Sequence, residues 1–257
     1  MDLQLKGKAA IVTGGSKGIG LACVEVLAEE GMSVAILDRD VEAGHEAVDR
    51  LAAGGADVAF VQCDLADRAG LVAAVDRACD GLRGVHVLVN SAGIQEYGNV
   101  VDTPEEQWDR VLAVNLTGAF LVSKQVVPRI LASGGGAIVN IASVQAFAAQ
   151  RNVVAYASSK GGLVQLTRAM AVDLAPAIRV NCVCPGSVDT PMLRSSARLF
   201  SDHPDEAIAE WGKMHPMGRV ASPGEVAAVA AFLASPRAGF TTASAYFADG
   251  GLLSLIG

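Results

Sequence analysis

Short apolar runs alternate along the chain with segments of helical periodicity. The apolar runs predict buried strands at Ala9–Thr13, Ser33–Leu37, Val58–Gln62, Val85–Val89, Ala137–Ala142, Ile178–Val183 and Ser244–Ala248. Helical spacing predicts helices at Gly18–Glu30, Val41–Ala53, Ala66–Gly81, Thr103 to about Leu131, Val154–Leu174 and Ser222 to Ala234. This alternation predicts an α/β fold, with a doubly wound parallel sheet of seven strands and helices on both faces.

Composition changes this picture little. The 257 residues are 51% hydrophobic but only 5% aromatic, so the core is expected to be aliphatic, as buried parallel strands require. Since α/β folds often reach this length as one unit, we expect a single domain over residues 1–257. Ligands of such sheets bind at the carboxyl ends of the strands, so the functional residues are sought there.

Charge and targeting signals exclude several classes of function. The net charge is −7 and no Lys/Arg run occurs, which argues against nucleic acid or an anionic membrane as a partner. No apolar run approaches the roughly 20 residues of a membrane span, and the N-terminus lacks an apolar signal region. We therefore expect a cytoplasmic protein. The five cysteines and four histidines have no spacing typical of disulfides or metal sites, so no metal is expected.

Glycines between the first strand and first helix predict a phosphate-binding loop. The run Thr13–Gly20 has the spacing Gly-x3-Gly-x-Gly, and such a turn presents backbone N–H groups and a positive helix end to a pyrophosphate. The alternative is a tight turn with no ligand. The candidate residues of this loop are Gly14, Ser16, Lys17, Gly18, Ile19 and Gly20.

Asp38, at the end of the second strand, bears on the choice of cofactor. A carboxylate there accepts hydrogen bonds from the adenosine ribose hydroxyls and repels a 2′-phosphate, which predicts NAD over NADP. Lys17 and Arg39 favour the opposite choice, because either could contact a 2′-phosphate. We give Asp38 more weight, since it excludes the phosphate without rearrangement.

Tyr156 and Lys160 lie one helical turn apart in Tyr-Ala-Ser-Ser-Lys. An isolated tyrosine has a pKa of about 10 and is a poor base at neutral pH. A lysine on the same helix face favours the phenolate, so the pair is expected to transfer protons near neutral pH.

These motifs together resemble the short-chain dehydrogenase/reductase superfamily, in its single-domain branch of about 250 residues. The resemblance covers Thr13 to Gly251 and adds Asp64, Asn90-Ser91-Ala92-Gly93, Asn115, Ser143 and Pro185-Gly186 to the glycine loop and the Tyr-x3-Lys pair. It implies a Rossmann-like fold. Three departures, at Ser91, Ala175–Ala177 and Thr242-Ala243, bear on loop shape or subunit packing but not on the chemistry.

The resemblance also implies roles for individual residues. Tyr156 is the acid/base, Ser143 binds the reacting oxygen, Lys160 binds the nicotinamide ribose and lowers the tyrosine pKa, and Asn115 anchors a relay water. The cofactor is implied to contact Asp64, Leu65, Asn90, Ala92, Gly93, Pro185, Gly186, Val188 and Thr190, in addition to the loop, Asp38, Arg39, Tyr156 and Lys160.

The substrate side is less specific. The resemblance implies that a segment at about 187–217 covers the substrate, with Met192 and Trp211 as candidates. Polar candidates flank the serine and tyrosine at Gln95, Gln145, Gln150, Arg151 and Asn152. A polar pocket favours a hydroxylated substrate, so we predict a sugar or polyol dehydrogenase acting on a secondary alcohol or hemiacetal.

Two other functions remain open, together with an expected assembly. The first is an NADPH-dependent reductase of 3-oxoacyl thioesters, and the second is a dinucleotide-binding regulator without catalysis. The resemblance further implies a homo-oligomer, expected to be a tetramer, in which the helices bearing Asn115 and Tyr156 and the apolar end at 250–257 form contacts.

Overall fold

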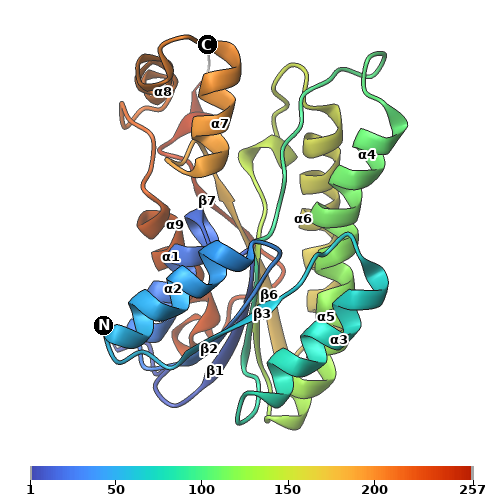
Figure 1. Cartoon of the computed structure of the whole chain (residues 1–257), viewed down its shortest axis with the longest axis vertical. Helices are drawn as coiled ribbons and strands as arrows, with labels where there is room; N and C mark the ends of the chain where they lie inside the picture. The colour runs from blue at the N-terminus through green and yellow to red at the C-terminus, as the bar shows by residue number, and fades with distance from the viewer. Residues whose placement is uncertain (1, 256–257) are drawn as a thin grey trace.

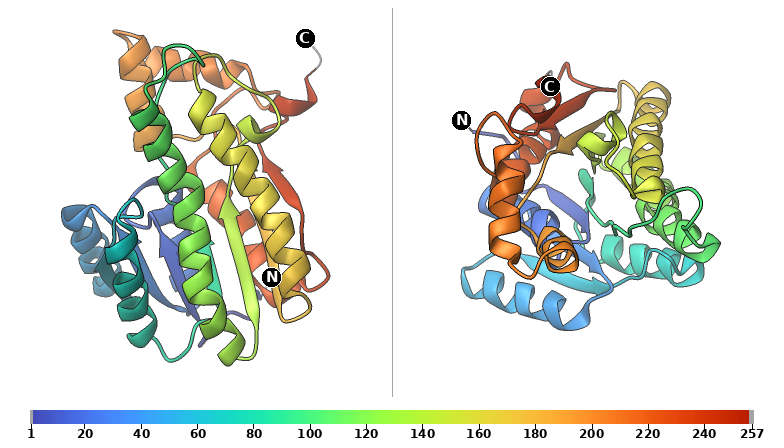
Figure 2. Two further views of the ribbon diagram at one scale, coloured as in Figure 1. Left: turned by 90° about the vertical axis from the view of Figure 1, so that its right-hand side faces the viewer. Right: turned by 90° about the horizontal axis from the view of Figure 1, so that it is seen from above.

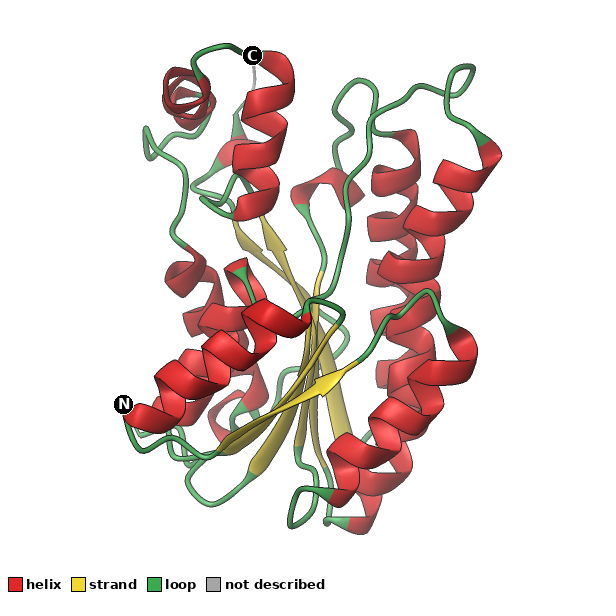
Figure 3. Cartoon of the chain, in the orientation of Figure 1, coloured by secondary structure: helices red, strands yellow, loops and turns green. Residues whose placement is uncertain are grey.

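A seven-stranded parallel sheet forms the centre of the computed structural model, which describes residues 2–255. Its strands are β1 (Ala9–Thr13), β2 (Ser33–Asp38), β3 (Val58–Gln62), β4 (Val87–Asn90), β5 (Gly136–Ile141), β6 (Ile178–Pro185) and β7 (Ala245–Ala248). They lie in the order β3-β2-β1-β4-β5-β6-β7, and every pair is parallel (Figure 3). This confirms the predicted doubly wound fold, and the strand order reverses between β1 and β4, where a ligand crevice is expected.

Helices cover both faces of the sheet (Figure 1). On one face lie α1 (Gly18–Glu29), α2 (Val41–Ala53) and α9 (Pro223–Ala234). On the other lie α3 (Arg68–Asp80), α4 (Glu105–Leu112), α5 (Ala119–Ala132) and α6 (Val154–Leu174). Two helices from the segment 187–217, α7 (Pro191–Phe200) and α8 (Pro204–Lys213), stand beyond the carboxyl ends of the strands (Figure 2).

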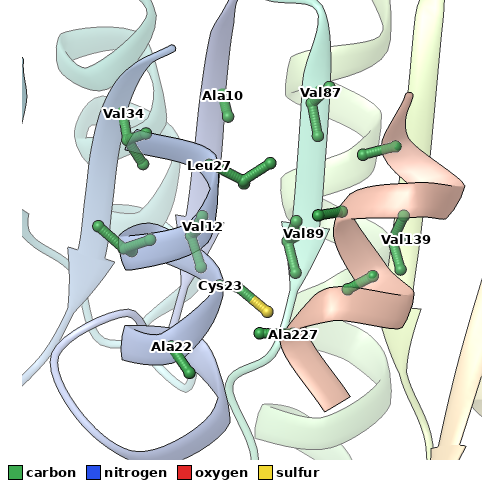
Figure 4. Packing of buried hydrophobic residues seen from close by; sticks show 14 of the residues in the cluster. Ala10, Val12, Ala22, Cys23, Leu27, Val34, Val87, Val89, Val139 and Ala227 are labelled. Carbon is green, nitrogen blue, oxygen red and sulfur yellow. The ribbon is translucent and has the colours of Figure 1, made fainter. Parts of the chain in front are cut away.

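The core is aliphatic, as the composition predicts. Every residue of β1 and β4 is buried, because helices cover both faces of these strands. Figure 4 shows Leu27 of α1 packing toward Val12 and Val89 of the sheet, and Cys23 of α1 lies close to Ala227 of α9. Small residues on both helices allow this close approach, and each fully buried valine or leucine stabilises the fold by about 1.5–3 kcal/mol. All five cysteines are free and buried.

The long helix predicted from Thr103 to about Leu131 differs from the prediction in two respects. Pro104 occupies the N-cap position and the helix begins at Glu105, while the Thr103 hydroxyl donates to the Asn99 carbonyl. A π-helical turn, Ala113–Gly118, then separates α4 from α5. A π turn holds one residue more than an α turn and is frequent at functional sites. Asn115 lies within it.

The same helix requires a correction to the expectation about membrane spans. Glu105–Ala132 is long and apolar enough to cross a bilayer by length and composition alone. Its most apolar window is 39% buried inside the protein, where α5 packs against α3 and the sheet. A core helix of a soluble protein has the same profile, so this single helix is weak evidence for a membrane segment.

The two ends of the described chain lie at opposite edges of the sheet (Figure 1). The Asp2 carbonyl accepts a hydrogen bond from Arg237, which follows the last turn of α9 at the amino edge. Leu252–Ser254 form a 3₁₀ turn near the carboxyl edge, where Gly251 contacts Pro216. The predicted apolar contact at 250–257 extends in part beyond the described residues, and within them Leu255 is exposed.

Candidate active site

The glycine loop leaves β1 in conformations that favour glycine. Gly14 has φ +65°, and a Cβ there would lie 2.7 Å from Ala92 Cα. The Thr13 hydroxyl accepts hydrogen bonds from the backbone N–H groups of Ser91 (3.1 Å) and Ala92 (3.2 Å). The Thr13 side chain thus joins the end of β1 to the loop after β4 through backbone N–H groups of that loop. For this reason serine at position 91 leaves the turn intact.

The end of β2 fixes the other side of the loop. The Asp38 carboxylate accepts hydrogen bonds from the Ser16 N–H and the Asp40 N–H, both at 3.1 Å. The Ser16 hydroxyl is buried and has no partner among the described residues. An unpaired buried hydroxyl in a glycine-rich turn at a helix start fits a phosphate oxygen, so the residues present fit a dinucleotide.

Two cations flank Asp38. Lys17 pairs with Asp40, with 2.6 Å between Nζ and Oδ2, and this hydrogen bond raises the pKa of the lysine. Asp40 also caps α2 by accepting from the Ala43 N–H. Lys17 is therefore held at the start of α2, and Arg39 is exposed.

The remaining adenosine-side candidates divide by their side-chain contacts. Asp64 is exposed and accepts a hydrogen bond from the Ala66 N–H, whereas Leu65 is buried in the core near Gly118. The Asn90 amide donates to Ser123 and Asn140 inside the protein. The side chain of Asn90 therefore points into the protein, and only its backbone remains available to a ligand in the crevice.

Three hydrogen bonds fix the side chain of Asn115 beside the loop after β4. Its amide donates to the Ile94 carbonyl (2.9 Å) and to Ser159 of α6 (3.0 Å), and its carbonyl accepts from the Ile94 N–H (2.8 Å). A Cβ on Gly93 would lie 3.3 Å from Lys160 Nζ and 3.4 Å from Asn115 Oδ1. The π turn thus brings Asn115 beside Gly93 and α6.

Ser143, Tyr156 and Lys160 are all buried near the carboxyl end of β5. The Ser143 hydroxyl accepts from the Gln145 N–H at 3.1 Å. Lys160 Nζ donates to the Ile141 carbonyl at 2.8 Å and lies 5.6 Å from the centroid of the Tyr156 ring. Three of the four predicted catalytic side chains therefore converge, and Asn115 joins them through Ser159.

Burial dominates the protonation of this group. It raises the pKa of Tyr156 to about 12, against the opposing effect of a hydrogen bond with Ser143. It lowers the pKa of Lys160 to about 8. The protein alone therefore does not produce the lowered tyrosine pKa expected from the lysine, because desolvation favours the neutral form of both groups. A lysine effect on the tyrosine in the complete complex stays a prediction.

The polar substrate candidates have distinct surroundings. The Gln145 amide nitrogen donates to Gln150 at 3.0 Å, and its Oε1 is buried without a partner among residues 2–255. Gln95 donates to the hydroxyl of Tyr97. Asn152 is exposed, has φ +59°, and its carbonyl accepts from the Gly98 N–H. Gln145 is thus the candidate that retains an unused acceptor.

A short parallel bridge between Val188 and Ala221 joins the start of the segment 187–217 to the residues that follow its end. Thr190 caps α7 by accepting from the Leu193 N–H, and its methyl group faces Gly18 of the glycine loop. The segment ends near buried His215. The Nε2 atom of this histidine accepts from the Ser187 N–H, and its Nδ1 lies 3.1 Å from the Trp211 carbonyl.

The other candidates of this region lie at the end of β6 and on the helices α7 and α8. Gly186 leaves no space for a side chain, since a Cβ would lie 2.8 Å from His215 Nε2, and Pro185 ends β6. Met192 lies on α7 and Trp211 on α8, both half-buried. Within residues 2–255, no group of three or more His, Cys, Asp or Glu side chains is arranged to hold a metal ion.

Sequence reasoning missed Tyr97, which contacts α7. Its hydroxyl donates to Ser196 at 2.7 Å, and its ring packs edge-on against Phe200, with 4.7 Å between ring centroids. Ser196 follows Tyr97 by 99 residues, so no spacing in the sequence joins them. The available signal was its position, four residues after the Asn-Ser-Ala-Gly motif in a chain with three tyrosines.

Comparisons with known proteins agree with this geometry. A family model described as enoyl-(acyl carrier protein) reductase matches residues 14–253. An oxidoreductase of Thermotoga maritima is 39% identical over 97% of each chain. The structure resembles aldohexose dehydrogenase of Thermoplasma acidophilum (TM-score 0.90, 38% identity, 98% and 96% coverage). It also resembles L-sorbose reductase of Gluconobacter frateurii, solved with NADPH and L-sorbose (TM-score 0.94, 33% identity, 100% coverage of both chains).

Proposed function

Because the chain belongs to the short-chain dehydrogenase/reductase family, we propose that it is an NAD-dependent dehydrogenase of a sugar or polyol. It would transfer hydride between the nicotinamide and a secondary alcohol and its ketone, or a hemiacetal and its lactone. The proposal rests on one observation: Ser143, Tyr156 and Lys160 are buried together at the carboxyl end of the sheet, with Asn115 linked to them through Ser159.

The proposed roles follow from what alcohol oxidation requires. A hydride leaves carbon while a proton leaves oxygen, and a bound nicotinamide supplies the hydride acceptor. Tyr156 as phenolate takes the proton, and in reduction it returns the proton as phenol. Ser143 donates a hydrogen bond to the reacting oxygen, where charge develops. Lys160 supplies positive charge beside the phenolate and binds the nicotinamide ribose.

Preference for NAD is supported by the charges around the ribose end of the crevice. Asp38 lies at the end of β2, where its charge disfavours a 2′-phosphate. The ion pair with Asp40 engages Lys17, one of the two cations that could favour NADP. Arg39 is the remaining one. This balance supports NAD as the preferred cofactor.

A hydroxylated substrate is supported by Gln145. Its unpartnered Oε1 is an acceptor two residues from Ser143, and a substrate hydroxyl would satisfy it. A substrate without a donor would leave it unpaired, which disfavours apolar alcohols. The names of the two structural neighbours, an aldohexose dehydrogenase and an L-sorbose reductase, agree with a sugar.

The test measures the reduction of NAD or NADP by the purified protein. The candidate substrates are sugars, polyols, simple secondary alcohols and steroids. Turnover of sugars or polyols with NAD is the expected result. Gln145→Met, which keeps the length of the side chain and removes the amide, should raise KM for the polyol at least threefold more than KM for a monohydroxy alcohol. Turnover of steroids alone in this screen, or of 3-oxoacyl thioesters alone in the reverse assay with NADH and NADPH, would refute the substrate class.

The segment 187–217 is proposed to cover the substrate. Its helices α7 and α8 stand above the carboxyl ends of the strands (Figure 2). Its first residues lie against Gly18, so closure of α7 would exclude water from both cofactor and substrate. The whole chain, 1–257, would then act as one catalytic unit in the cytoplasm.

An NADPH-dependent reductase of 3-oxoacyl thioesters is the second candidate. It is favoured by the description of the matching family model, an enoyl-(acyl carrier protein) reductase, and by exposed Arg39. Initial rates of ketone and thioester reduction with NADH and NADPH distinguish the two. A regulator without catalysis is the remote alternative. Tyr156→Phe should abolish turnover, and full activity of that variant would refute the assigned acid/base.

The proposal also includes a homo-oligomer, for which we propose a tetramer. The outer faces of α5 and α6 expose Phe120 and Val172, which are 47% and 77% accessible. Apolar side chains on two neighbouring helices support contact with a second copy. Light scattering after size-exclusion chromatography should give a multiple of the 26.3 kDa chain mass, and a monomer mass would refute the oligomer.

A further inference from the structure

A directed chain of hydrogen bonds connects the loop after β4 to α7. The Gln95 amide donates to the Tyr97 hydroxyl (3.1 Å), which donates to Ser196 Oγ (2.7 Å). Ser196 in turn donates to the Met192 carbonyl, one turn earlier in α7 (3.1 Å). Each hydroxyl accepts one hydrogen bond and donates one, so the direction of the chain is defined. Ser196 is only 6% exposed, so this contact is shielded from water.

The aromatic ring of Tyr97 makes a second contact with the same helix. It meets the Phe200 ring edge-on, with an interplanar angle of 88°. Ser196 and Phe200 are one turn apart, so the hydroxyl and the ring of one tyrosine hold two successive turns of α7. Phe200 is otherwise 56% exposed, and the Tyr97 ring is its aromatic partner.

The loop that carries Tyr97 is anchored to the catalytic side. The Gly98 N–H donates to the Asn152 carbonyl (2.8 Å), and the Val154 N–H donates to the Gly98 carbonyl (3.3 Å). This bridge lies two residues before Tyr156. The Gln107 amide of α4 donates to the Tyr97 carbonyl at 3.2 Å. The backbone of Tyr97 is thus fixed to α4 and to the start of α6, while its side chain reaches α7.

The loop of Tyr97 also lies close to the acid/base, because Gly98 bridges to Val153 at the start of the helix that carries Tyr156. The near end of α7 is fixed separately, by the Thr190 cap beside Gly18. Tyr97 therefore supplies the contact at the far end of this helix, between the loop after β4 and the segment 187–217.

We propose that Tyr97 is a positioning residue that latches α7 closed over the group Ser143, Tyr156 and Lys160. The latch acts through Ser196 and Phe200. The latch does not touch the reacting atoms. It makes closure favourable before the substrate arrives, so that less of the substrate's binding energy is spent on ordering the helix. The inference rests on the proposed dehydrogenase function only where kinetics are used to test it.

The test compares Tyr97→Phe, Ser196→Ala and the double variant. Tyr97→Phe keeps the ring against Phe200 and removes the hydroxyl. Loss of a binding contribution made equally to substrate and transition state raises KM and leaves kcat unchanged. We expect KM for the polyol to rise about 3–10-fold, the size of one lost hydrogen bond, with kcat within twofold. The double variant should resemble either single one, since both break the same bond.

Limited trypsin digestion gives a readout that needs no turnover. Arg194 and Arg198 lie on α7, and cleavage there requires the helix to open. Each variant should be cut at these sites about 3–10-fold faster than the natural protein. Tyr246→Phe on β7 is the matched control, because it removes a tyrosine hydroxyl that forms no hydrogen bond with α7 among residues 2–255, and it should change neither the cleavage rate nor KM.

The outcomes separate the latch from the enzyme proposal. Unchanged cleavage at Arg194 and Arg198 in both single variants would overturn the latch. Faster cleavage in both, with no turnover of any substrate by the natural protein, would support the latch and refute only the proposed activity. A fall in kcat with unchanged KM would also contradict the inference, because it would indicate a role in the chemical step.

Discussion

At the residue scale, the site combines buried groups whose neutral forms are favoured by desolvation with a few charges at its entrance. Tyr156 and Lys160 are fully enclosed, whereas Asp38, Lys17 and Arg39 lie at the edge of the sheet. We propose that the enclosed groups carry the proton chemistry, because their protonation responds strongly to a nearby charge. We propose that the charges at the edge discriminate between NAD and NADP through attraction and repulsion. Individual substitutions test these two roles separately.

Asp38→Asn should weaken the discrimination against NADP. The amide keeps an oxygen that can accept from the Ser16 N–H, while the charge that opposes a 2′-phosphate is lost. The ratio of kcat/KM with NAD to kcat/KM with NADP is expected to fall about 10–100-fold. Asp49→Asn, the same change at an exposed position of α2, is the control. A ratio that stays constant in the Asp38 variant would exclude this carboxylate as the determinant.

Lys160→Met should stabilise the protein at neutral pH while it abolishes activity. The pKa of Lys160 is about 8 in the fold against an ordinary value of 10.5, so below pH 8 both states are protonated and the buried charge costs stability. Between pH 8 and 10.5 the folded state releases its proton first, and this cost disappears as the pH rises.

The expected gain is on the order of 1–3 kcal/mol at pH 7, after the lost hydrogen bond to Ile141 is allowed for, and it should shrink by pH 10. Urea unfolding of both proteins at the two pH values measures it. A variant less stable than the natural protein at pH 7 would show that the lysine contributes more as a hydrogen-bond donor than its burial costs.

Ala243→Gly should stabilise the fold. Ala243 has φ +61°, a left-handed conformation that costs a residue with a Cβ about 1–2 kcal/mol. Its N–H donates to the Val180 carbonyl at 2.8 Å, which glycine would preserve. A net gain of about 0.5–1 kcal/mol is expected in urea unfolding, because glycine also gains freedom in the unfolded chain. Ala73→Gly, on the exposed face of α3, should instead destabilise by a similar amount.

At the element scale, the start of a helix follows from local sequence signals, whereas the irregular turn inside one helix follows from contacts made at the site. The predicted cap at Ser222 is a capping box with Glu225, and Pro223 occupies the first turn of α9. The π turn at Ala113–Gly118 has no comparable signal, because residues of low helix propensity such as Asn115, Thr117 and Gly118 do not distinguish a π turn from an α turn. It exists where Asn115 must meet Ile94 and Ser159, which lie on other elements.

Ser222→Ala should destabilise the protein without affecting turnover. The Ser222 hydroxyl donates to the Glu225 carboxylate (3.2 Å), which also accepts from the Ser222 N–H (2.8 Å), and loss of this capping contact costs about 1 kcal/mol. For a chain of this length the thermal midpoint should fall by about 2–4 °C. Ser195→Ala, on an exposed helical position of α7, should leave the midpoint unchanged. A change in kcat in the Ser222 variant would contradict the separation of this cap from the site.

At the scale of the whole molecule, the parallel sheet explains how much the sequence could predict. Strand runs and the alternation with helices specify the layers, and the motif residues lie after strands whose carboxyl ends share one edge. Thr13, Asp38, Asn90 and Ser143 could therefore be brought together without a structure. Contacts between the motif loops and the segment 187–217, such as that of Tyr97 with Ser196, have no periodicity and could not.

The opposite positions of the two chain ends have a practical consequence for attaching this protein to a sensor surface. Asp2 is tethered to Arg237 at the amino edge of the sheet, away from the crevice, whereas the turn Leu252–Ser254 lies beside the base of the segment that carries α7 and α8. A linker joined at the amino end would present the crevice to the solution. The same linker joined at the carboxyl end would place α7 and α8 against the support, so the choice of terminus decides how freely dissolved molecules reach the crevice.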